Sequence, residues 1–172
     1  MIDLRKTLNE AHQILAEAQV SHALIGGFAL ASYGHHRATS DIDLLADGTK
    51  SDIIRNIFLK NSYKLRFESE EVLQFSGPGH LDILLANRPL SQQMLKQAVL
   101  NLDLNIYILR PEDLIGLKIQ AYKNDPARAL QDKADIQGLL NIKSIDLNLV
   151  KKYADIFNEW PEIQKIYKQV LI

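Results

Sequence analysis

The chain contains no cysteine among its 172 residues, which excludes disulfide bridges and thiolate metal sites. This composition is compatible with the cytoplasm, where we expect the protein to reside. No stretch approaches the roughly 20 consecutive apolar residues that a membrane-spanning helix needs, so no membrane association is expected. The first residues carry early charges and no apolar core, which is unlike an export signal.

The sequence also lacks an excess of charge of either sign, because 20 Lys and Arg oppose 21 Asp and Glu, for a net charge of −1. A protein that grips long duplex DNA through many phosphates usually carries a clear basic excess. The charge balance therefore gives no support for duplex DNA binding. No internal repeat and no Gly/Ser-rich linker divides the chain, so a single compact unit is expected.

Periodicity of the apolar residues predicts an α+β fold. Helices are expected at 4–18, 28–33, 91–100 and, with Ser51 as the capping residue, 51–60. Strands are expected at 22–25, 41–45, 63–68, 72–75, 80–85 and 104–109. After Pro111 the pattern changes to helices alone, at 111–123, 127–140, 146–157 and 161–171. The sequence thus predicts a core over residues 1–110 and a C-terminal helical bundle over 111–172, packed together as one unit.

Three aspartates in this pattern call for a cation. Asp41 and Asp43 are two residues apart on one predicted strand, where neighbours on the same face lie about 6–7 Å apart. Like charges at that distance repel unless a cation lies between them, and Mg²⁺ or Mn²⁺ suits such oxygen ligands. Asp82 interrupts an apolar run, as Asp41 does, and an unpaired charge is costly there. A ligand role explains all three carboxylates.

Gly26 and Gly27 end a short apolar run and open the helix that follows it. Free backbone N–H groups and the positive end of a helix dipole can receive phosphate oxygens at such a turn. Two residues without side chains also allow a triphosphate to approach the backbone closely. A plain strand-to-helix turn is the alternative for this pair when it is considered alone.

The segment IGGFALASYGHHRATSDIDLLA, residues 25–46, resembles the signature of the DNA polymerase beta superfamily of nucleotidyltransferases, in which a Gly-Gly or Gly-Ser pair and a short helix precede Asp-x-Asp. Leu81-Asp82-Ile83 matches the third carboxylate of that family, on a later strand. Downstream, PEDLIGLK (residues 111–118) and the residues from Arg128 to Ile136 are similar to the small abortive-infection toxin-like branch. The resemblance covers roughly residues 20–140. Gly27 departs from the serine of many active members, although the toxin-like branch accepts glycine.

This resemblance implies a mixed β-sheet nucleotidyltransferase core with helices on one face. Asp41, Asp43 and Asp82 would be the catalytic and metal-binding residues for Mg²⁺ or Mn²⁺, with Asp82 also helping to deprotonate the acceptor. The implied nucleotide-binding residues are Gly26, Gly27, Arg37, Thr39, Ser40 and Lys118. The reaction would move NMP from ATP or another NTP to a hydroxyl and release pyrophosphate. The acceptor stays open among tRNA or another RNA, a protein side chain and a small molecule.

Several residues allow two interpretations. Arg37 suits a phosphate clamp, and it equally suits a surface ion pair. Lys118 lies within the apolar stripe of its helix, from which its ammonium reaches either the nucleotide or Asp132 and Asp135. His35 and His36 are best explained as a polar loop. His80 is expected on the same strand face as Asp82, lining the cleft.

Two other functions compete with catalysis. The first is a catalytically inactive nucleotidyltransferase fold kept as an interaction or regulatory module. The second is one half of a toxin–antitoxin pair. An intact set of three acids argues against the first, because a scaffold gains nothing from buried like charges.

Overall fold

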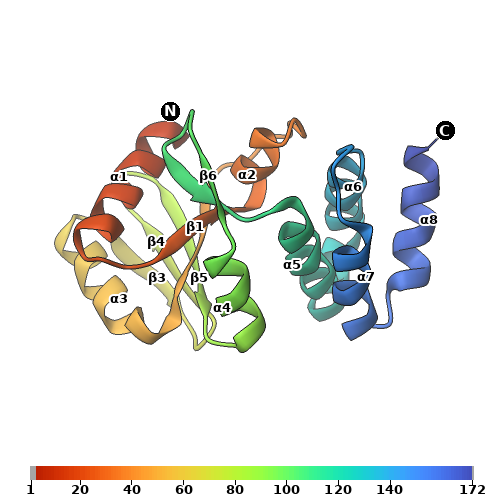
Figure 1. Cartoon of the computed structure of the whole chain (residues 1–172). Helices are drawn as coiled ribbons and strands as arrows, with labels where there is room; N and C mark the ends of the chain where they lie inside the picture. The colour runs from red at the N-terminus through yellow and green to blue at the C-terminus, as the bar shows by residue number, and fades with distance from the viewer. Residues whose placement is uncertain (1–2, 172) are drawn as a thin grey trace. The chain divides into compact units, whose positions relative to one another are not determined.

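The computed structural model describes residues 3–171 and confirms the α+β fold, built on a seven-stranded mixed sheet (Figure 1). The strand order is β3-β4-β5-β2-β1-β7-β6. β2 runs parallel to β5 and antiparallel to β1, and β1 runs parallel to β7. The strands are β1 (His22–Ile25), β2 (Ile42–Asp47), β3 (Lys64–Glu68), β4 (Val72–Ser76), β5 (His80–Ala86), β6 (Val99–Asn101) and β7 (Ile106–Ile108).

The chain divides into two compact units. The core unit comprises the chain up to Ala29 together with Arg37–Leu109, and the helical unit comprises Leu30–His36 and the chain from Arg110 onward. The last of the three boundaries, between Leu109 and Arg110, lies one residue from the division expected after residue 110. The sequence does not indicate that Leu30–His36 belongs to the helical unit, because the rest of that unit lies more than 70 residues further along the chain.

Helices of the core unit cover one face of the sheet. α1 (Leu4–Glu17) and α3 (Ser51–Lys60) pack against each other there (Figure 1). Phe58 of α3 contacts Phe75 of β4 with ring centroids 5.0 Å apart, and both side chains are buried. Burial of each such side chain contributes about 1.5–3 kcal/mol. The helix-facing residues of the central strands are all buried: Ile42, Leu44, Leu73, Phe75, Leu81 and Ile83.

Two local expectations are wrong. Ser51 is the first residue of α3 and not its cap, because the 3-10 turn η1 (Gly48–Lys50) precedes it and Asp47 accepts the N–H of Thr49 there. The helix expected at 91–100 is α4 (Pro89–Lys96), which ends earlier. Val99–Asn101 instead forms β6, paired antiparallel with β7. Hydrogen bonding to a strand later in the chain overrides the local helical pattern there.

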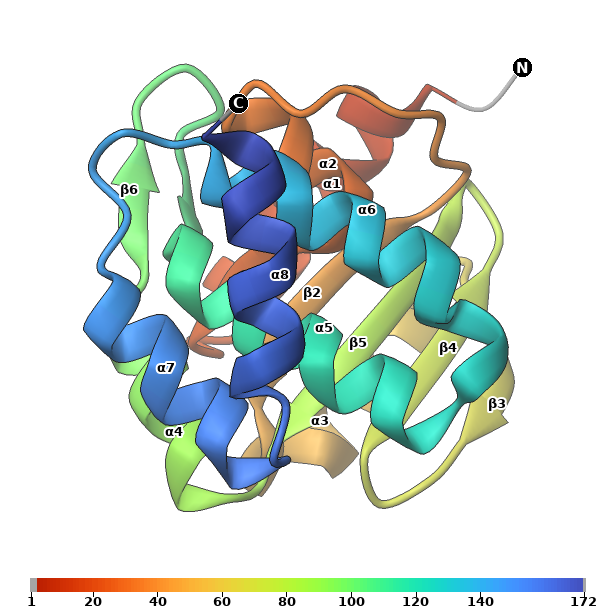
Figure 2. The ribbon, with the colours of Figure 1, turned by 90° about the vertical axis from the view of Figure 1, so that its right-hand side faces the viewer.

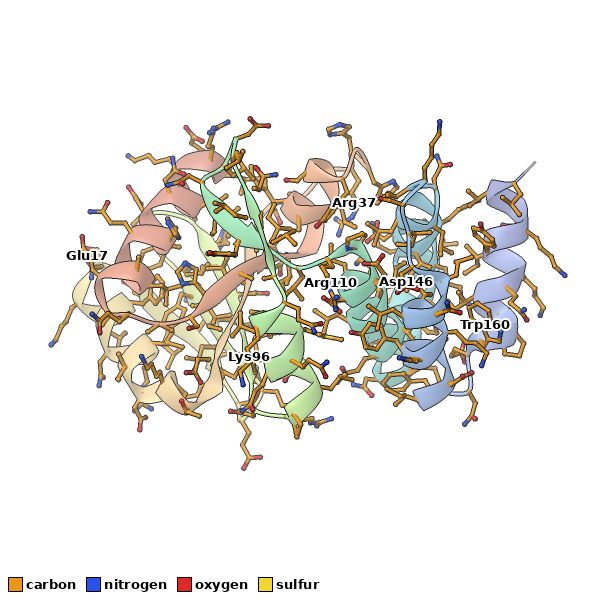
Figure 3. All side chains as sticks on the ribbon, in the orientation of Figure 1. Glu17, Arg37, Lys96, Arg110, Asp146 and Trp160 are labelled. Carbon is orange, nitrogen blue, oxygen red and sulfur yellow. The ribbon has the colours of Figure 1, made fainter. Side chains whose placement is uncertain are left out.

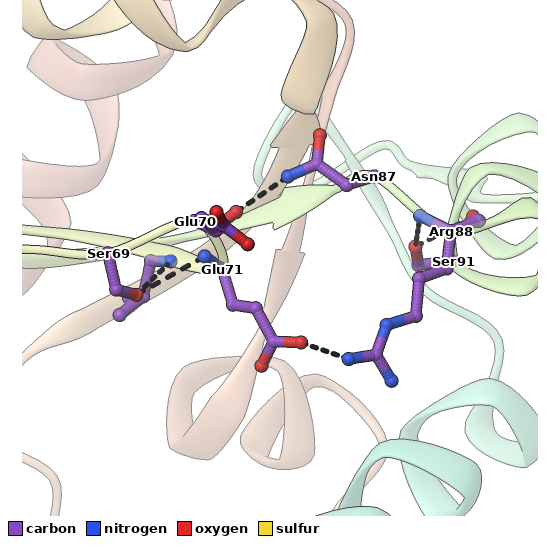
Figure 4. A network of polar contacts seen from close by, with 7 residues as sticks. Ser69, Glu70, Glu71, Asn87, Arg88 and Ser91 are labelled. Carbon is purple, nitrogen blue, oxygen red and sulfur yellow. Dashed lines mark hydrogen bonds and ion pairs between the residues drawn. The ribbon is translucent and has the colours of Figure 1, made fainter.

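A polar network ties the turn between β3 and β4 to the loop after β5 (Figure 4). Asn87 donates its side-chain N–H to the carbonyl of Glu70 at 2.6 Å, and Arg88 forms an ion pair with Glu71. Within the turn, Ser69 Oγ accepts the backbone N–H of Glu71 at 3.2 Å. These contacts connect the outer strand pair to the strand that carries Asp82.

From Arg110 onward, the helical unit contains four α-helices within the described residues. They are α5 (Pro111–Asn124), α6 (Ala129–Leu140), α7 (Leu147–Ile156) and α8 (Trp160–Val170), with the 3-10 turn η2 (Pro126–Arg128) before α6. α5 packs against α6 and α7, and α8 packs against the same two helices (Figure 2). Among residues 3–171, no helix is long and apolar enough to cross a membrane.

Charged groups are buried between α5 and α6. Lys118 Nζ lies 3.0 Å from Asp132 and 2.6 Å from Asp135, and its side chain is 10% exposed. Arg128 reaches Asp132 at 3.2 Å, and His35 Nε2 lies 3.3 Å from Asp135. We name these five residues the α5–α6 ion cluster. Each of the two aspartates in this cluster contacts at least one basic side chain, as a stable buried charge requires.

Candidate active site

The strand register of the sheet brings the three predicted aspartates together. Asp43 of β2 is the direct partner of Asp82 on the parallel strand β5, so both side chains project from the same face. Asp41 immediately precedes β2. One carboxylate oxygen from each residue lies within 4.8 Å of the others, and all three residues are half-buried. Within residues 3–171 this is the one group of three or more His, Asp or Glu residues so arranged.

The spacing of these oxygens fits a divalent cation. Oxygen ligands at about 2.0–2.6 Å from Mg²⁺ or Ca²⁺ lie up to roughly 4–5 Å from each other across the ion. The aspartate oxygens already lie within that range. Three carboxylates this close repel each other without a positive charge between them. The donor set contains only hard oxygens, which suits the Mg²⁺ or Mn²⁺ that the resemblance implies.

Gln74 holds one oxygen of Asp82. It lies opposite Asp82 on β4 and donates its amide Nε2–H to Asp82 Oδ2 at 3.0 Å. Burial raises the pKa of Asp82, and the negative charge of Asp41 raises it further, while the Gln74 hydrogen bond and His80 lower it. Because Gln74 occupies Oδ2, the other oxygen of this carboxylate is left to face a ligand.

Gly26 is required by the position of Asp43. Its φ is +66°, a conformation that L-residues with side chains rarely adopt. A Cβ on Gly26 would lie 1.9 Å from Asp43 Oδ2. The glycine therefore makes room for a carboxylate of the acid cluster, at the point where β1 ends and α2 (Gly26–Ser32) begins.

Gly27 makes room for the loop that leads into β2. A Cβ there would lie 2.9 Å from Thr39 Oγ1 and 3.2 Å from an Arg37 nitrogen. Thr39 donates its hydroxyl to Asp41 Oδ1 at 3.0 Å. Arg37 donates to the carbonyl of Ala38 at 3.1 Å, and Figure 3 labels it in this loop. The two glycines, the loop that leads into β2 and the three aspartates therefore lie next to one another.

The remaining predicted site residues differ in their surroundings. Ser40 is exposed beside Asp41. His80 shares the face of Asp82 on β5, and its charge lowers the pKa of that aspartate. Lys118 forms ion pairs in the α5–α6 ion cluster, the alternative that its position in the sequence left open. His35 belongs to the same cluster and is more than a polar loop residue.

Sequence reasoning missed Gln74 as a residue of this site. Its signal is the alternation in Val72-Leu73-Gln74-Phe75, where a polar residue stands among apolar ones on a strand. Only the register between β4 and β5 shows that its partner is Asp82.

Comparison with known proteins gives a consistent result. Residues 3–170 match the family described as "Nucleotidyltransferase of unknown function (DUF6036)". No curated protein sequence matches the chain significantly. Similar solved structures include the antibiotic-resistance factor ANT(2'')-Ia, with a TM-score of 0.71, 14% identity, and coverage of 98% of this chain and 99% of that one.

Two further solved structures share the fold. ANT(2'')-Ia in complex with adenylyl-2''-tobramycin has a TM-score of 0.67 and 13% identity, covering 90% of this chain and 96% of that chain. The lincosamide antibiotic adenylyltransferase LnuA, bound to lincomycin, has a TM-score of 0.57 and 17% identity, and the match covers 82% of this chain and 97% of that chain. These likenesses establish the fold, while the family match spans nearly the whole sequence. The chain therefore belongs to this nucleotidyltransferase family.

Proposed function

We propose that the protein transfers a nucleoside monophosphate from an NTP to an acceptor hydroxyl and uses a divalent metal. The observation that supports this most directly is the convergence of Asp41, Asp43 and Asp82 within 4.8 Å beside Gly26. Asp41 and Asp43 would hold Mg²⁺ or Mn²⁺, together with Asp82. The bound metal would supply Lewis-acid stabilisation of the phosphate oxygens.

The proton of the acceptor is assigned to Asp82. Its Oδ1 is the oxygen that Gln74 does not engage, and the hydrogen bond from Gln74 fixes the orientation of the carboxylate. The acceptor oxygen bonds to the α-phosphorus as the bond to the β-phosphate oxygen breaks. Pyrophosphate leaves, and the acceptor proton passes to Asp82.

The loop and the glycine turn are assigned to the nucleotide. Gly26 and Gly27 begin α2, and the first N–H groups of a helix lack partners within it. Arg37, Thr39 and the exposed Ser40 lie beside these glycines or the aspartates. Lys118 is left out of this set, because its ion pairs with Asp132 and Asp135 favour a structural role.

The acceptor is proposed to be a small molecule that carries a hydroxyl group. Support comes from ANT(2'')-Ia, which was solved in complex with adenylyl-2''-tobramycin, and from the lincosamide adenylyltransferase LnuA, which was solved with bound lincomycin. An RNA or a protein acceptor would be a different outcome of the experiment below.

The test is incubation of the protein with each α-phosphate-labelled NTP, Mg²⁺ or Mn²⁺ and cell lysate, followed by separation of label into small molecules, RNA and protein. We expect label in the small-molecule fraction, lost in Asp41→Asn and Asp43→Asn. Asp47→Asn is the matched control. Residue 47 also lies on β2 but outside the acid cluster, and the asparagine keeps a side-chain oxygen that can accept the N–H of Thr49. Calorimetric titration with NTP supplements the assay. Absence of NTP binding, or equal binding by Asp43→Asn, would favour the inactive module.

A further inference from the structure

The core unit contains a pocket of about 750 Å³ at the end of β1 and β2 opposite the acid cluster. His22 begins β1 and Asp47 ends β2, whereas Ile25 and Asp43 lie at the other ends of these strands. Both His22 and Asp47 line the pocket, as do residues of α1, α4 and β7. Small-molecule sites usually measure about 300–1,000 Å³, so the pocket has the size of a ligand site. None of its residues belongs to the proposed nucleotide site.

Two histidines in this pocket form a chain of hydrogen bonds. His22 Nδ1 lies 2.7 Å from the carbonyl of Val20, and His22 Nε2 lies 2.8 Å from His12 Nδ1. A carbonyl only accepts, so His22 Nδ1 carries a hydrogen. Burial lowers the pKa of His22 and keeps it neutral, so its Nε2 is bare and must accept from His12 Nδ1. Because His12 Nδ1 donates to His22, Nε2 is the ring nitrogen of His12 that remains for a ligand.

The charged groups of the pocket differ in whether they already have a partner within the protein. Asp47 Oδ1 already accepts the backbone N–H of Thr49 at 3.0 Å and its hydroxyl at 2.7 Å. Lys96, labelled on α4 in Figure 3, has no ion-pair or hydrogen-bond partner within residues 3–171. The pocket thus presents one ammonium without a protein partner, beside apolar surface from Val20, Leu95 and Tyr107.

We propose that this pocket binds a small organic acid with an apolar body and a hydroxyl group. The carboxylate pairs with Lys96, the hydroxyl donates to His12 Nε2, and the body packs against Val20, Leu95 and Tyr107. A charge-assisted hydrogen bond is stronger than a neutral one, so the carboxylate gives the larger share of specificity. The site is independent of the nucleotidyl transfer proposed above, because it uses other residues at the other end of the strands.

The experiment is an NMR titration of the full-length protein with 6-hydroxy-2-naphthoate, its neutral amide and 2-naphthoate. We expect 6-hydroxy-2-naphthoate to shift the signals of Ala16, Val20 and Ala98, and the amide to bind about tenfold more weakly. Lys96→Gln removes this difference. Lys60→Gln is the matched control, because Lys60 is also an exposed lysine in the last turn of a core-unit helix but lies outside the pocket.

The hydroxyl is tested separately with His12→Phe, which keeps a ring but removes the nitrogens. Wild type is expected to prefer 6-hydroxy-2-naphthoate over 2-naphthoate several-fold, and His12→Phe to bind both equally. Long-range ¹H–¹⁵N correlations are expected to show His22 with its hydrogen on Nδ1. Equal binding of acid and amide, an equal effect of Lys96→Gln and Lys60→Gln, or no binding at millimolar concentration would overturn the proposal.

Discussion

At Gly26 a positive φ and a close neighbour coincide, and the two effects can be separated by comparison with Gly34. Gly26 has φ +66° and no space for a Cβ, because Asp43 Oδ2 occupies it. Gly34 has φ +84° and nothing within 4 Å of a Cβ. Conformational strain alone therefore acts at Gly34, whereas strain and displacement of a carboxylate act together at Gly26.

Gly34→Ala is expected to lower the free energy of unfolding by about 1–2 kcal/mol, the cost of a left-handed conformation for an L-residue. Gly26→Ala is expected to lower it by more and also to weaken Mn²⁺ binding, because Asp43 must move. Urea unfolding and calorimetric Mn²⁺ titration measure the two effects. If both variants lost the same stability and kept the same Mn²⁺ affinity, the contact with Asp43 would have no importance for the site.

Asp82 is expected to destabilise the metal-free protein at neutral pH. Burial raises its pKa above the ordinary value of 3.8, so folding favours the neutral carboxyl. That favourable contribution is present at low pH and is lost as the pH rises through the raised pKa. Asp82→Asn should therefore raise the melting temperature in chelator at neutral pH, and the gain should vanish at or below pH 3.8.

Differential scanning calorimetry at several pH values measures this effect of Asp82→Asn. Asp103→Asn serves as the control, since Asp103 is exposed and no melting-temperature gain is expected from it. A fall in melting temperature for Asp82→Asn would instead assign Asp82 a structural role.

Single residues of the site were predictable where chemistry and spacing coincide. Asp41 and Asp43 are two residues apart, and Asp82 interrupts an apolar run, so their convergence could be expected before the sheet was known. The sequence alone did not show why residues 26 and 27 must be glycines. Gly26 and Gly27 make room for Asp43, Thr39 and Arg37, contacts that depend on how β1 and β2 align.

At the scale of elements, the helix pair α5 and α6 depends on a buried lysine. Lys118 is 10% exposed and faces two fully buried aspartates. Removal of one partner from a buried ion pair leaves an uncompensated charge, which typically costs about 3–5 kcal/mol. Without Lys118, the charges of the two aspartates would still be partly compensated, because Arg128 contacts Asp132 and His35 contacts Asp135.

Lys118→Met is expected to lower the free energy of unfolding by roughly 2–4 kcal/mol while leaving the NTP dissociation constant unchanged. Lys123→Met, on the same helix, removes an exposed pair with Glu159 and should cost about 1 kcal/mol or less. Chemical denaturation and nucleotide titration distinguish the two roles of Lys118. A large loss of NTP affinity with little loss of stability would return Lys118 to the nucleotide site.

Helices and strands were predictable from local periodicity, except where pairing with a strand elsewhere in the chain determines the secondary structure. Helix α1 and strand β5 lie within one or two residues of their expected bounds. Val99 and Leu100 were expected to be helical and instead belong to β6, because β7 supplies hydrogen-bond partners for that strand. The seven-stranded order could not be obtained from periodicity, which carries no information on which strands are neighbours.

At the scale of the whole molecule, the chain passes between the two units three times. It leaves the core unit after Ala29, returns at Arg37 and leaves again after Leu109. Leu30, in the first excursion, is fully buried, and His35 contacts Asp135 of α6. A boundary placed at residue 110 alone therefore does not describe two independent domains.

A chain that ends at Leu109 is expected to lose amide-exchange protection over residues 30–36, because it lacks the contacts made by α6. The central strand β2 is expected to remain better protected than this segment in the same truncated chain. Hydrogen exchange measured by mass spectrometry, with the full-length protein as the reference, compares the two regions. Protection of residues 30–36 equal to that in the full-length protein would show that the segment folds without the C-terminal helices.

The excursion of Leu30–His36 into the helical unit restricts how such a protein can change by recombination. A crossover that replaced the chain after Leu109 would combine new C-terminal helices with the original residues 30–36. Asp135 would then be replaced while its partner His35 stayed the same. We therefore expect a chimaera to keep its stability only when residues 30–36 and the chain from Arg110 onward come from the same parent.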